Sequence, residues 1–216
     1  ILGSYTTYMV NSGLGLDPIV SGILFMPIFF AGGAVFYRVY HVCFEARGED
    51  PLRGLAFFFG IMFVIEVLLI ISYGVDYRLV EAAYIGATVG YGALTLPLRM
   101  VAPFLAALIL TFGIQLFLSK TFTGRAITAV AQDQIAVQLM AINPTYIKQI
   151  AFGIAIMTAS LAGALLIVIG PVEPSMGRQY IGRVFAIAVL GGMGSIPGTL
   201  VAALILGVAE SLTATF

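Results

Sequence analysis

The chain has 216 residues, of which 61% are hydrophobic and 9% are charged. Soluble domains carry about 25% charged residues, so this composition excludes an ordinary soluble protein and predicts a polytopic membrane protein. The 10 basic and 10 acidic residues cancel, so the chain lacks the positive excess expected of a nucleic-acid-binding surface. The single cysteine, Cys43, excludes an internal disulfide.

The first residues are apolar and carry no charged leader. Residues 1–10 have the pattern of the end of a helix, and the turn-rich sequence NSGLGLDP follows at residues 11–18. A secretory signal would open with a basic stretch, which this segment lacks. We expect the sequence to be a fragment without its natural N-terminal helix and C-terminal end.

Four apolar stretches are long enough to cross a membrane, because about 20 helical residues span the hydrocarbon core. They cover residues 19–37, 55–72, 100–118 and 149–170. Pro103 falls in the first turn of the third stretch, where a missing N–H costs least. Residues 73–99 are too rich in glycine for an assignment. The pattern predicts an all-α membrane protein, a polytopic transmembrane helix bundle.

The distribution of lysine and arginine between the loops predicts which side of the bundle faces the cytoplasm. The segments 38–54 and 120–148 each contain three lysines or arginines outside the spans, and the two other loops each contain two. Cytoplasmic loops carry an excess of lysine and arginine, and the parity of the spans agrees with that bias. We therefore expect 38–54 to be a cytoplasmic loop and 120–148 to lie on the same side.

The segment 120–148 is the longest polar-faced stretch of the chain, with room for one or two short helices. Apolar residues recur in it at helical spacing, and polar residues lie between them. Thr123 is a candidate N-cap, and Gly124, Asn143 and Pro144 punctuate the segment. Because such helices are too short to form a domain, we expect them to dock on a soluble partner.

A glycine-rich sequence, GGMGSIPG, interrupts the last apolar stretch at residues 191–198. Seven apolar residues precede it, and residues 199–212 follow. Irregular backbone at membrane depth is tolerated where protein buries it or water reaches it. We expect a re-entrant or broken helix near the C-terminal end, lining a cavity. A tight turn between two helices at the membrane surface is the alternative.

Small residues recur four positions apart in the last two apolar stretches, which favours close helix packing in lipid. The rows are Ala155, Ala159 and Gly163, then Thr199, Ala203, Gly207 and Ser211.

Glu66 lies in the middle of the second apolar stretch. A carboxylate at that depth costs about 2.5–3.5 kcal/mol, so it should face other helices or a wet cavity. A structural hydrogen bond, a role in a pathway and contact with a ligand are all open readings. Glu210, near the end of the last helix, is expected to snorkel or cap. With one histidine and one cysteine, neither a metal site nor a catalytic pair is expected, and a P-loop is absent.

Two long motifs carry a family resemblance. GRAITAVAQDQIAVQLMAIN at Gly124–Asn143 and VLGGMGSIPGTLVAALILGVAE at Val189–Glu210 resemble the signature regions of branched-chain amino-acid ABC importer permeases. PLRG at residues 51–54 is similar to a weaker family feature, and the resemblance covers nearly the whole chain. It implies one transmembrane permease domain over residues 1–216, in a multi-pass protein of the bacterial cytoplasmic (inner) membrane.

The resemblance also implies partners. A permease of this family pairs with a second homologous permease subunit, as a homodimer or heterodimer, within membrane lipid. Two ABC ATPase subunits bind its cytoplasmic side, and a periplasmic substrate-binding protein delivers the solute. The chain itself would be a transport subunit without enzymatic activity or cofactor, because ATP hydrolysis belongs to the partner ATPases.

Matching positions give two groups of candidate residues. The ATPase-coupling group is Gly124, Arg125, Ala126, Ala129, Asp133 and Asn143, with Thr123 added as the candidate N-cap. The translocation-path group is Gly191, Gly192, Gly194, Ser195 and Gly198, with Glu66 added from its depth in the membrane. Ala141 and the pair Ala202–Ala203 depart from family glycines, which puts the local backbone geometry there in question.

The resemblance implies translocation of branched-chain amino acids, or of another amino acid, an amide or urea. We expect the segment Gly124–Met140 to act as a lever moved by the ATPases. An ATPase-independent secondary transporter or channel is the alternative, but it would need several polar groups at mid-membrane, and Glu66 is the one candidate.

Overall fold

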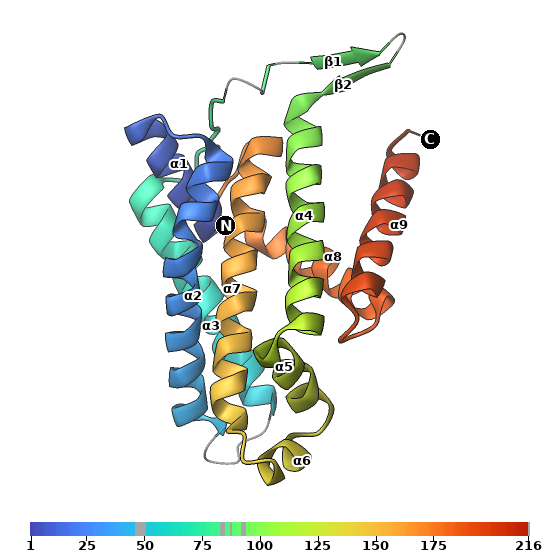
Figure 1. Cartoon of the computed structure of the whole chain (residues 1–216). Helices are drawn as coiled ribbons and strands as arrows, with labels where there is room; N and C mark the ends of the chain where they lie inside the picture. Colours follow the sequence, from blue (N-terminus) through green and yellow to red (C-terminus); the bar gives the residue numbers. More distant parts are fainter. Residues whose placement is uncertain (46–50, 83–84, 87, 92–93, 216) are drawn as a thin grey trace. The chain divides into compact units, whose positions relative to one another are not determined.

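The computed structural model describes residues 1–45, 51–82, 85–86, 88–91 and 94–215 (Figure 1). Nine helices and one two-stranded hairpin form within these residues. The helices are α1 (Leu2–Leu14), α2 (Pro18–Cys43), α3 (Pro51–Tyr73), α4 (Leu98–Lys120), α5 (Phe122–Gln132), α6 (Gln134–Leu139), α7 (Pro144–Ile169), α8 (Met176–Gly191) and α9 (Ile196–Thr215). The strands β1 (Thr88–Tyr91) and β2 (Leu94–Pro97) pair antiparallel.

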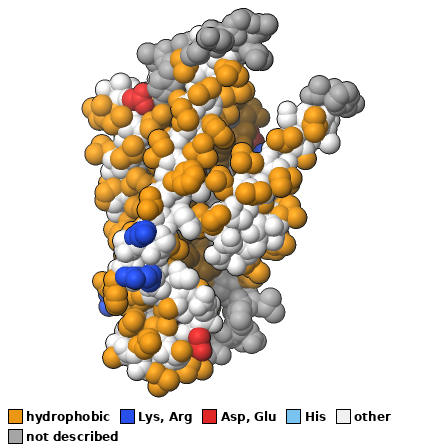
Figure 2. Space-filling view, turned by 45° about the vertical axis from the view of Figure 1, so that its right-hand side comes forward, with side chains coloured by type: hydrophobic (Ala, Val, Ile, Leu, Met, Phe, Trp, Pro, Cys, Tyr) orange, Lys and Arg blue, Asp and Glu red, His pale blue; other side chains and the backbone are white. Residues whose placement is uncertain are grey.

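Five of these helices are long and apolar enough to cross a membrane, namely α2, α3, α4, α7 and α9. The first four correspond to the four predicted spans, except that α7 ends at Ile169, one residue before the predicted end; the helices expected there are confirmed. Side chains exposed along them are mostly aliphatic or aromatic, and Figure 2 shows apolar side chains covering most of the visible surface. In water such a surface would be costly, whereas lipid tails solvate it.

The chain divides into two compact units. Unit 1 contains Ile1–Ala107 and Asn143–Pro174, and unit 2 contains Leu108–Ile142 and Ser175–Phe216. Helix α4 passes from the first unit to the second.

The core of unit 1 is built where α1, α2 and α7 pack together (Figure 1). A Cβ added to Gly22 would lie 2.7 Å from the Cβ of Ala164, and one added to Gly33 would lie 3.0 Å from the Cα of Gly153. These contacts show that α2 and α7 run antiparallel at close range, because rising numbers in one helix meet falling numbers in the other. Small residues thus let two backbones approach, as predicted for lipid-embedded helices.

The register of that small-residue seam differs from the prediction. Ala155 and Ala159 of the predicted row are exposed, whereas Gly163 lies against Ser4 of α1, whose hydroxyl donates to the Gly163 carbonyl at 2.6 Å. The other close contacts are made by Ser160 and Ala164, each one position after a residue of the predicted row, and by Gly153, two positions before Ala155. Spacing alone cannot tell which of two neighbouring rows faces the partner helix.

Several boundaries also differ from the prediction. Helix α1 continues to Leu14 and ends at Gly15, whose φ of 65° only glycine adopts at low cost. Pro103 lies inside α4 rather than in its first turn, because the helix begins at Leu98. The predicted loop 38–54 is partly helical, since α2 reaches Cys43 and α3 begins at Pro51. Residues 46–50 of that loop lie outside the described residues.

Candidate functional site

Helix α5 begins with a threonine cap, but not at the predicted residue. Thr121 Oγ1 accepts a hydrogen bond from the Gly124 N–H at 3.0 Å, so Thr121 is the N-cap. The prediction of Thr123 as the cap is wrong, because Thr123 already lies within the helix. The Thr121 hydroxyl also donates to the Phe117 carbonyl at 2.7 Å, which joins the end of α4 to the start of α5.

Gly124 sets the angle between α4 and α5. A Cβ at this position would lie 2.3 Å from the Phe117 carbonyl oxygen and 2.5 Å from the Leu118 Cα. Real Cβ atoms do not approach backbone atoms so closely, so the turn of α5 onto α4 requires glycine. Gly124 therefore lies inside α5 and allows the two helices to meet.

Two further coupling residues are helix caps. Asp133 Oδ1 accepts from the N–H groups of Ile135 at 2.8 Å and Ala136 at 3.1 Å, which starts α6 where α5 ends. Asn143 Oδ1 accepts from the N–H of Thr145 at 3.0 Å and begins α7. These caps satisfy backbone donors that a helix start leaves open. The polar residues of the segment thus divide it into two short helices, where the sequence allowed one or two.

Helices α5 and α6 have one buried side and one exposed side. Gly124, Ala126 and Val130 are buried, while Arg125 is exposed. At the end of α6, Leu139 is 85% exposed and Met140 is 76% exposed. Large apolar side chains outside the candidate spans, on helices with strong polar faces, fit a surface that another protein covers.

The predicted glycine-rich break is a four-residue turn between α8 and α9. Gly192 has φ 82° and Gly194 has φ 97°, a region that disfavours every side chain. Ser195 Oγ accepts from the Gly198 N–H at 3.2 Å and caps the start of α9. The helix is interrupted here, as both the re-entrant or broken helix and the tight turn between two helices predict.

The two outer glycines of the turn allow α8 and α9 to touch. A Cβ on Gly198 would lie 2.0 Å from the Gly191 carbonyl oxygen, and one on Gly191 would lie 2.5 Å from the Thr199 backbone. Farther along the same pair, Arg183 Nε lies 2.9 Å from Glu210 Oε1. Glu210, predicted to snorkel or cap, therefore forms an ion pair across the helical hairpin.

Unit 2 brings parts of both predicted groups to one hollow of about 520 Å³. Arg125 and Ala129 of the coupling group line it together with Gly194 and Ser195 of the path group. The remaining walls come from the end of α4, the outer turns of α5 and the start of α9: Gln115, Leu118, Ser119, Thr128, Gln132, Ile196 and Pro197. The hollow is open to one side and has polar groups on its α5 wall.

The other predicted residues are not among those that line the hollow. Gly124, Ala126 and Asp133 shape α5 and α6, and Gly191, Gly192 and Gly198 shape the turn. Glu66 and Asn143 belong to unit 1. Glu66 is 8% exposed, so this carboxyl group is buried within the protein, as its depth in an apolar helix required.

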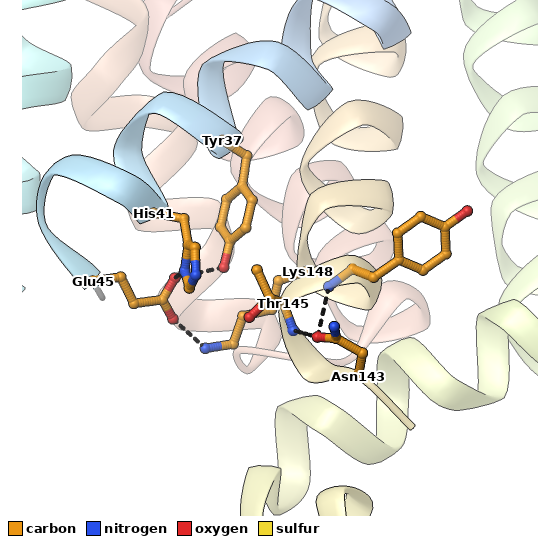
Figure 3. A network of polar contacts seen from close by, with 7 residues as sticks. Tyr37, His41, Glu45, Asn143, Thr145 and Lys148 are labelled. Atoms are coloured by element: carbon orange, nitrogen blue, oxygen red, sulfur yellow. Dashed lines mark hydrogen bonds and ion pairs between the residues drawn. The ribbon is translucent and has the colours of Figure 1, made fainter. Parts of the chain in front are cut away.

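Sequence reasoning missed a polar network in unit 1. Glu45, next to the end of α2, contacts Lys148 of α7, and Tyr37 and His41 of α2 contact the same carboxylate (Figure 3). The spacing of four between His41 and Glu45 was a local signal. The partner Lys148 lies 103 residues away, a separation over which one sequence gives no pairing signal.

Five candidate membrane-spanning helices, with the two short helices α5 and α6 outside them, define a polytopic membrane protein. Residues 1–216 match the family described as the permease component of the branched-chain amino acid transport system, and the chain belongs to this family.

The chain is similar to permease proteins of two kinds, for branched-chain amino acids and for ribose. The chain is 28% identical to BraD, a high-affinity branched-chain amino acid transport system permease protein of Pseudomonas aeruginosa, over 99% of this chain and 73% of that protein. It is 28% identical to the corresponding protein LivH of Escherichia coli K12, over 100% of this chain and 74% of LivH. The ribose import permease protein RbsC of Escherichia coli matches 42% of the chain at 37% identity. No solved structure matches the chain.

Proposed function

We propose that this permease component is driven by two ATPase subunits that bind α5 and α6 from the cytoplasm, and that it moves a branched-chain amino acid across a bacterial inner membrane. A periplasmic binding protein delivers the solute, and a second homologous permease subunit completes the path. The solute is that of BraD and LivH, whose names state it. The observation that carries the proposal is the hollow of unit 2, which is lined both by residues of the predicted coupling group and by residues of the predicted path group.

The exposed side of α5 and α6 supports an ATPase interface. Arg125 and the apolar side chains of Leu139 and Met140 are available to a partner. Interfaces favour such a mixture, because arginine supplies directed hydrogen bonds and buried apolar groups supply most of the free energy. The helix caps at Thr121 and Asp133 and the close contact of Gly124 with α4 restrict the backbone of this segment. We infer that the segment is rigid enough to transmit a displacement.

The geometry of unit 2 supports a topology in which the short helix α8 runs through the membrane back towards the coupling side. The turn at Gly194 lines the hollow together with Leu118 and Ser119 at the C-terminal end of α4, which leads into α5. In the proposed topology, the chain leaves α7 on the opposite side of the membrane. Helix α8 must therefore carry it towards the coupling side, although its 16 residues extend about 24 Å, less than a core of about 30 Å. We infer that α8, the turn and α9 form a broken or re-entrant hairpin.

A mechanism follows from this placement. ATP binding closes the two ATPases and displaces α5, and the displaced helix reshapes the hollow whose other wall is the Gly194 turn. Because packed helices switch between discrete arrangements, the movement opens or closes the path in a stepwise manner. Gly192 and Gly194 supply backbone freedom in the turn, where residues of the path group lie beside residues of the coupling group.

Reconstitution tests this function. The chain, its second permease subunit, the ATPases and the binding protein are placed in liposomes, and uptake of labelled leucine is compared with uptake of urea. We expect leucine accumulation that requires ATP. Arg125→Glu, which reverses a charge on the exposed wall of the hollow, should lower ATP-dependent uptake about tenfold or more.

Asp76→Lys is the matched control, since this exposed carboxylate lies in the predicted loop on the other side of the membrane. Leucine uptake driven by an ion gradient without ATPases would favour a secondary transporter and would overturn the proposal. Uptake of urea but not leucine would reassign the solute alone.

A further inference from the structure

Glu45 is the centre of a polar network that joins the end of α2 to the start of α7. Lys148 Nζ donates to Glu45 Oε1 at 2.5 Å, and Tyr37 Oη donates to Oε2 at 2.6 Å. His41 Nδ1 lies 2.9 Å from the same Oε2 (Figure 3). Both carboxylate oxygens are therefore occupied, and the Glu45 and Lys148 side chains are 27% and 28% exposed.

The contact is stronger than an ordinary surface ion pair. Partial burial alone would raise the pKa of the Glu45 carboxyl, but the hydrogen bonds from Lys148, Tyr37 and His41 outweigh it and lower the pKa to about 2. Exposed pairs lack such surrounding donors and contribute little. The Glu45 carboxylate thus stays ionised at every physiological pH.

Neither charge is placed to stabilise its own helix. Glu45 lies just beyond the C-terminal end of α2, and Lys148 lies near the N-terminal end of α7. The helix dipole is negative at the C-terminal end of α2, which disfavours the negative charge of Glu45. It is positive at the N-terminal end of α7, which disfavours the positive charge of Lys148. The two charges are stabilised by each other, which makes the contact a cross-link between helices.

The network closes a seam that runs the length of both helices. Gly22 meets Ala164, Gly33 meets Gly153, and Gln149 Nε2 donates to the Ala34 carbonyl at 3.1 Å. Phe152 packs on Tyr37, with 5.9 Å between ring centroids. With Glu45 and Lys148 joined at the last position, α2 and α7 are held together from one end to the other.

The cross-link also lies next to the coupling segment along the chain. Helix α6 ends at Leu139, and α7 begins at Pro144 behind the Asn143 cap. Lys148 is the fifth residue of α7, so a pull on the end of α6 reaches this residue within little more than one helical turn.

We propose that Glu45 is a positioning residue of the transport cycle: its contact with Lys148 makes α2 follow α7 when the coupling segment is displaced. This inference rests on the proposed function for the source of the displacement. Without the contact, the start of α7 moves alone, and ATP hydrolysis is spent without moving the body that α2 and α7 form.

A charge-exchange series in the assembled complex tests the role. In Glu45→Lys and in Lys148→Glu, we expect normal insertion and assembly, while leucine transported per ATP hydrolysed falls about 5- to 10-fold. Combining both changes should restore at least half of the wild-type ratio. Arg38→Gln, a charge loss at an exposed position of α2, is the matched control. If uptake falls only in proportion to assembled complex, with an unchanged ratio, the residue is merely structural and the proposal fails.

A distance measurement tests the cross-link without any transported solute. Nitroxide labels are placed at Val42 and Tyr146, which are 59% and 60% exposed, after Cys43→Ser removes the native thiol. In wild type we expect one narrow distance with and without trapped nucleotide. In Glu45→Gln we expect a broadened distance without nucleotide and a further shift with it.

An unchanged narrow distance in Glu45→Gln would overturn the inference. If wild-type complex shows no ATP-dependent uptake while the nucleotide-free distance still broadens in Glu45→Gln, the proposed function fails and the cross-link between α2 and α7 stands.

Discussion

Gly124 is a residue whose missing side chain fixes a corner of the protein. The space for its Cβ is already filled by the Phe117 carbonyl and the Leu118 backbone, so a methyl group must push α5 away from α4. We expect Gly124→Ala to lower the free energy of unfolding by about 1–3 kcal/mol. Far-UV circular dichroism during titration of the purified chain with SDS measures this loss.

Gly113 of α4 provides the comparison, because nothing lies within 4 Å of a Cβ built there. Gly113→Ala should leave stability unchanged or raise it by about 0.5–1 kcal/mol, as glycine is a poor helix former. Equal unfolding midpoints for the two alanine variants would show that the α4–α5 corner does not depend on glycine.

Glu45 gives a pH dependence with a defined sign. Its pKa in the folded chain, about 2, lies below the ordinary glutamate pKa of 4.5 because Lys148, Tyr37 and His41 hydrogen-bond to the carboxylate and outweigh its partial burial. The stability that Glu45 contributes is therefore complete above about pH 4.5 and is lost as the pH falls from there towards 2. In a His41→Gln background, which removes the imidazole beside the carboxylate, we expect the effect of Glu45→Gln on the unfolding free energy to stay constant from pH 7 to 5 and to shrink below 4.5. A difference that already shrinks between pH 7 and 5 would contradict this.

The type of a residue predicted its local role, such as a helix cap, better than it predicted which distant residue it contacts. Asp133 and Asn143 belonged to the resembling motif, and their type alone favours helix starts, which is where both lie. The true cap of α5, Thr121, stands two residues before the predicted Thr123, because both threonines satisfy the same local rule. Partners far along the chain, such as Lys148 for Glu45, depend on how helices assemble, and that arrangement is not written in any local window.

The helical hairpin of α8 and α9 depends on two glycines with positive φ. Gly194 has φ 97°, so a side chain there costs about 1–3 kcal/mol of backbone strain. We expect Gly194→Ala to destabilise the chain by this amount and to reduce leucine uptake more than it reduces the amount of inserted protein. Uptake per inserted chain and SDS unfolding measure the two effects.

Gly207 of α9 is the matched position, since its added Cβ meets no atom within 4 Å. Gly207→Ala should retain uptake per inserted chain. If Gly194→Ala behaves in the same way, the turn does not require left-handed backbone, and its part in the path is refuted.

The hydrophobicity of the sequence predicted which helices exist, but it did not predict where each helix begins and ends. Apolar stretches located α2, α3, α4 and α7 because a span must be apolar throughout. Helix α8 was underestimated as seven residues, since Arg178 and Arg183 made its first half appear polar; the ion pair with Glu210 accounts for Arg183. The β1–β2 hairpin was not predicted, because glycines obscure the alternation that marks strands.

At the scale of the whole molecule, each compact unit holds a different part of the proposed mechanism. Unit 1 contains the close-packed body of α1, α2 and α7, and unit 2 contains α5, α6 and the glycine turn. Composition predicted a membrane protein, and the motifs predicted its family, which the full-length match confirms. The hollow that joins Arg125 to Gly194 needed three dimensions, because it gathers residues about 70 positions apart.

The claim that the permease is driven through α5 and α6 is tested most directly by cross-linking in the assembled complex. A photo-reactive phenylalanine analogue is placed at Leu139, which is 85% exposed at the end of α6, and at Ile109, which is 73% exposed in the α4 span. On illumination of inverted membrane vesicles, we expect the probe at position 139 to capture the ATPase subunit and the probe at position 109 to capture none. Capture of lipid or of the periplasmic binding protein from position 139, with no ATPase adduct, would contradict this mechanism.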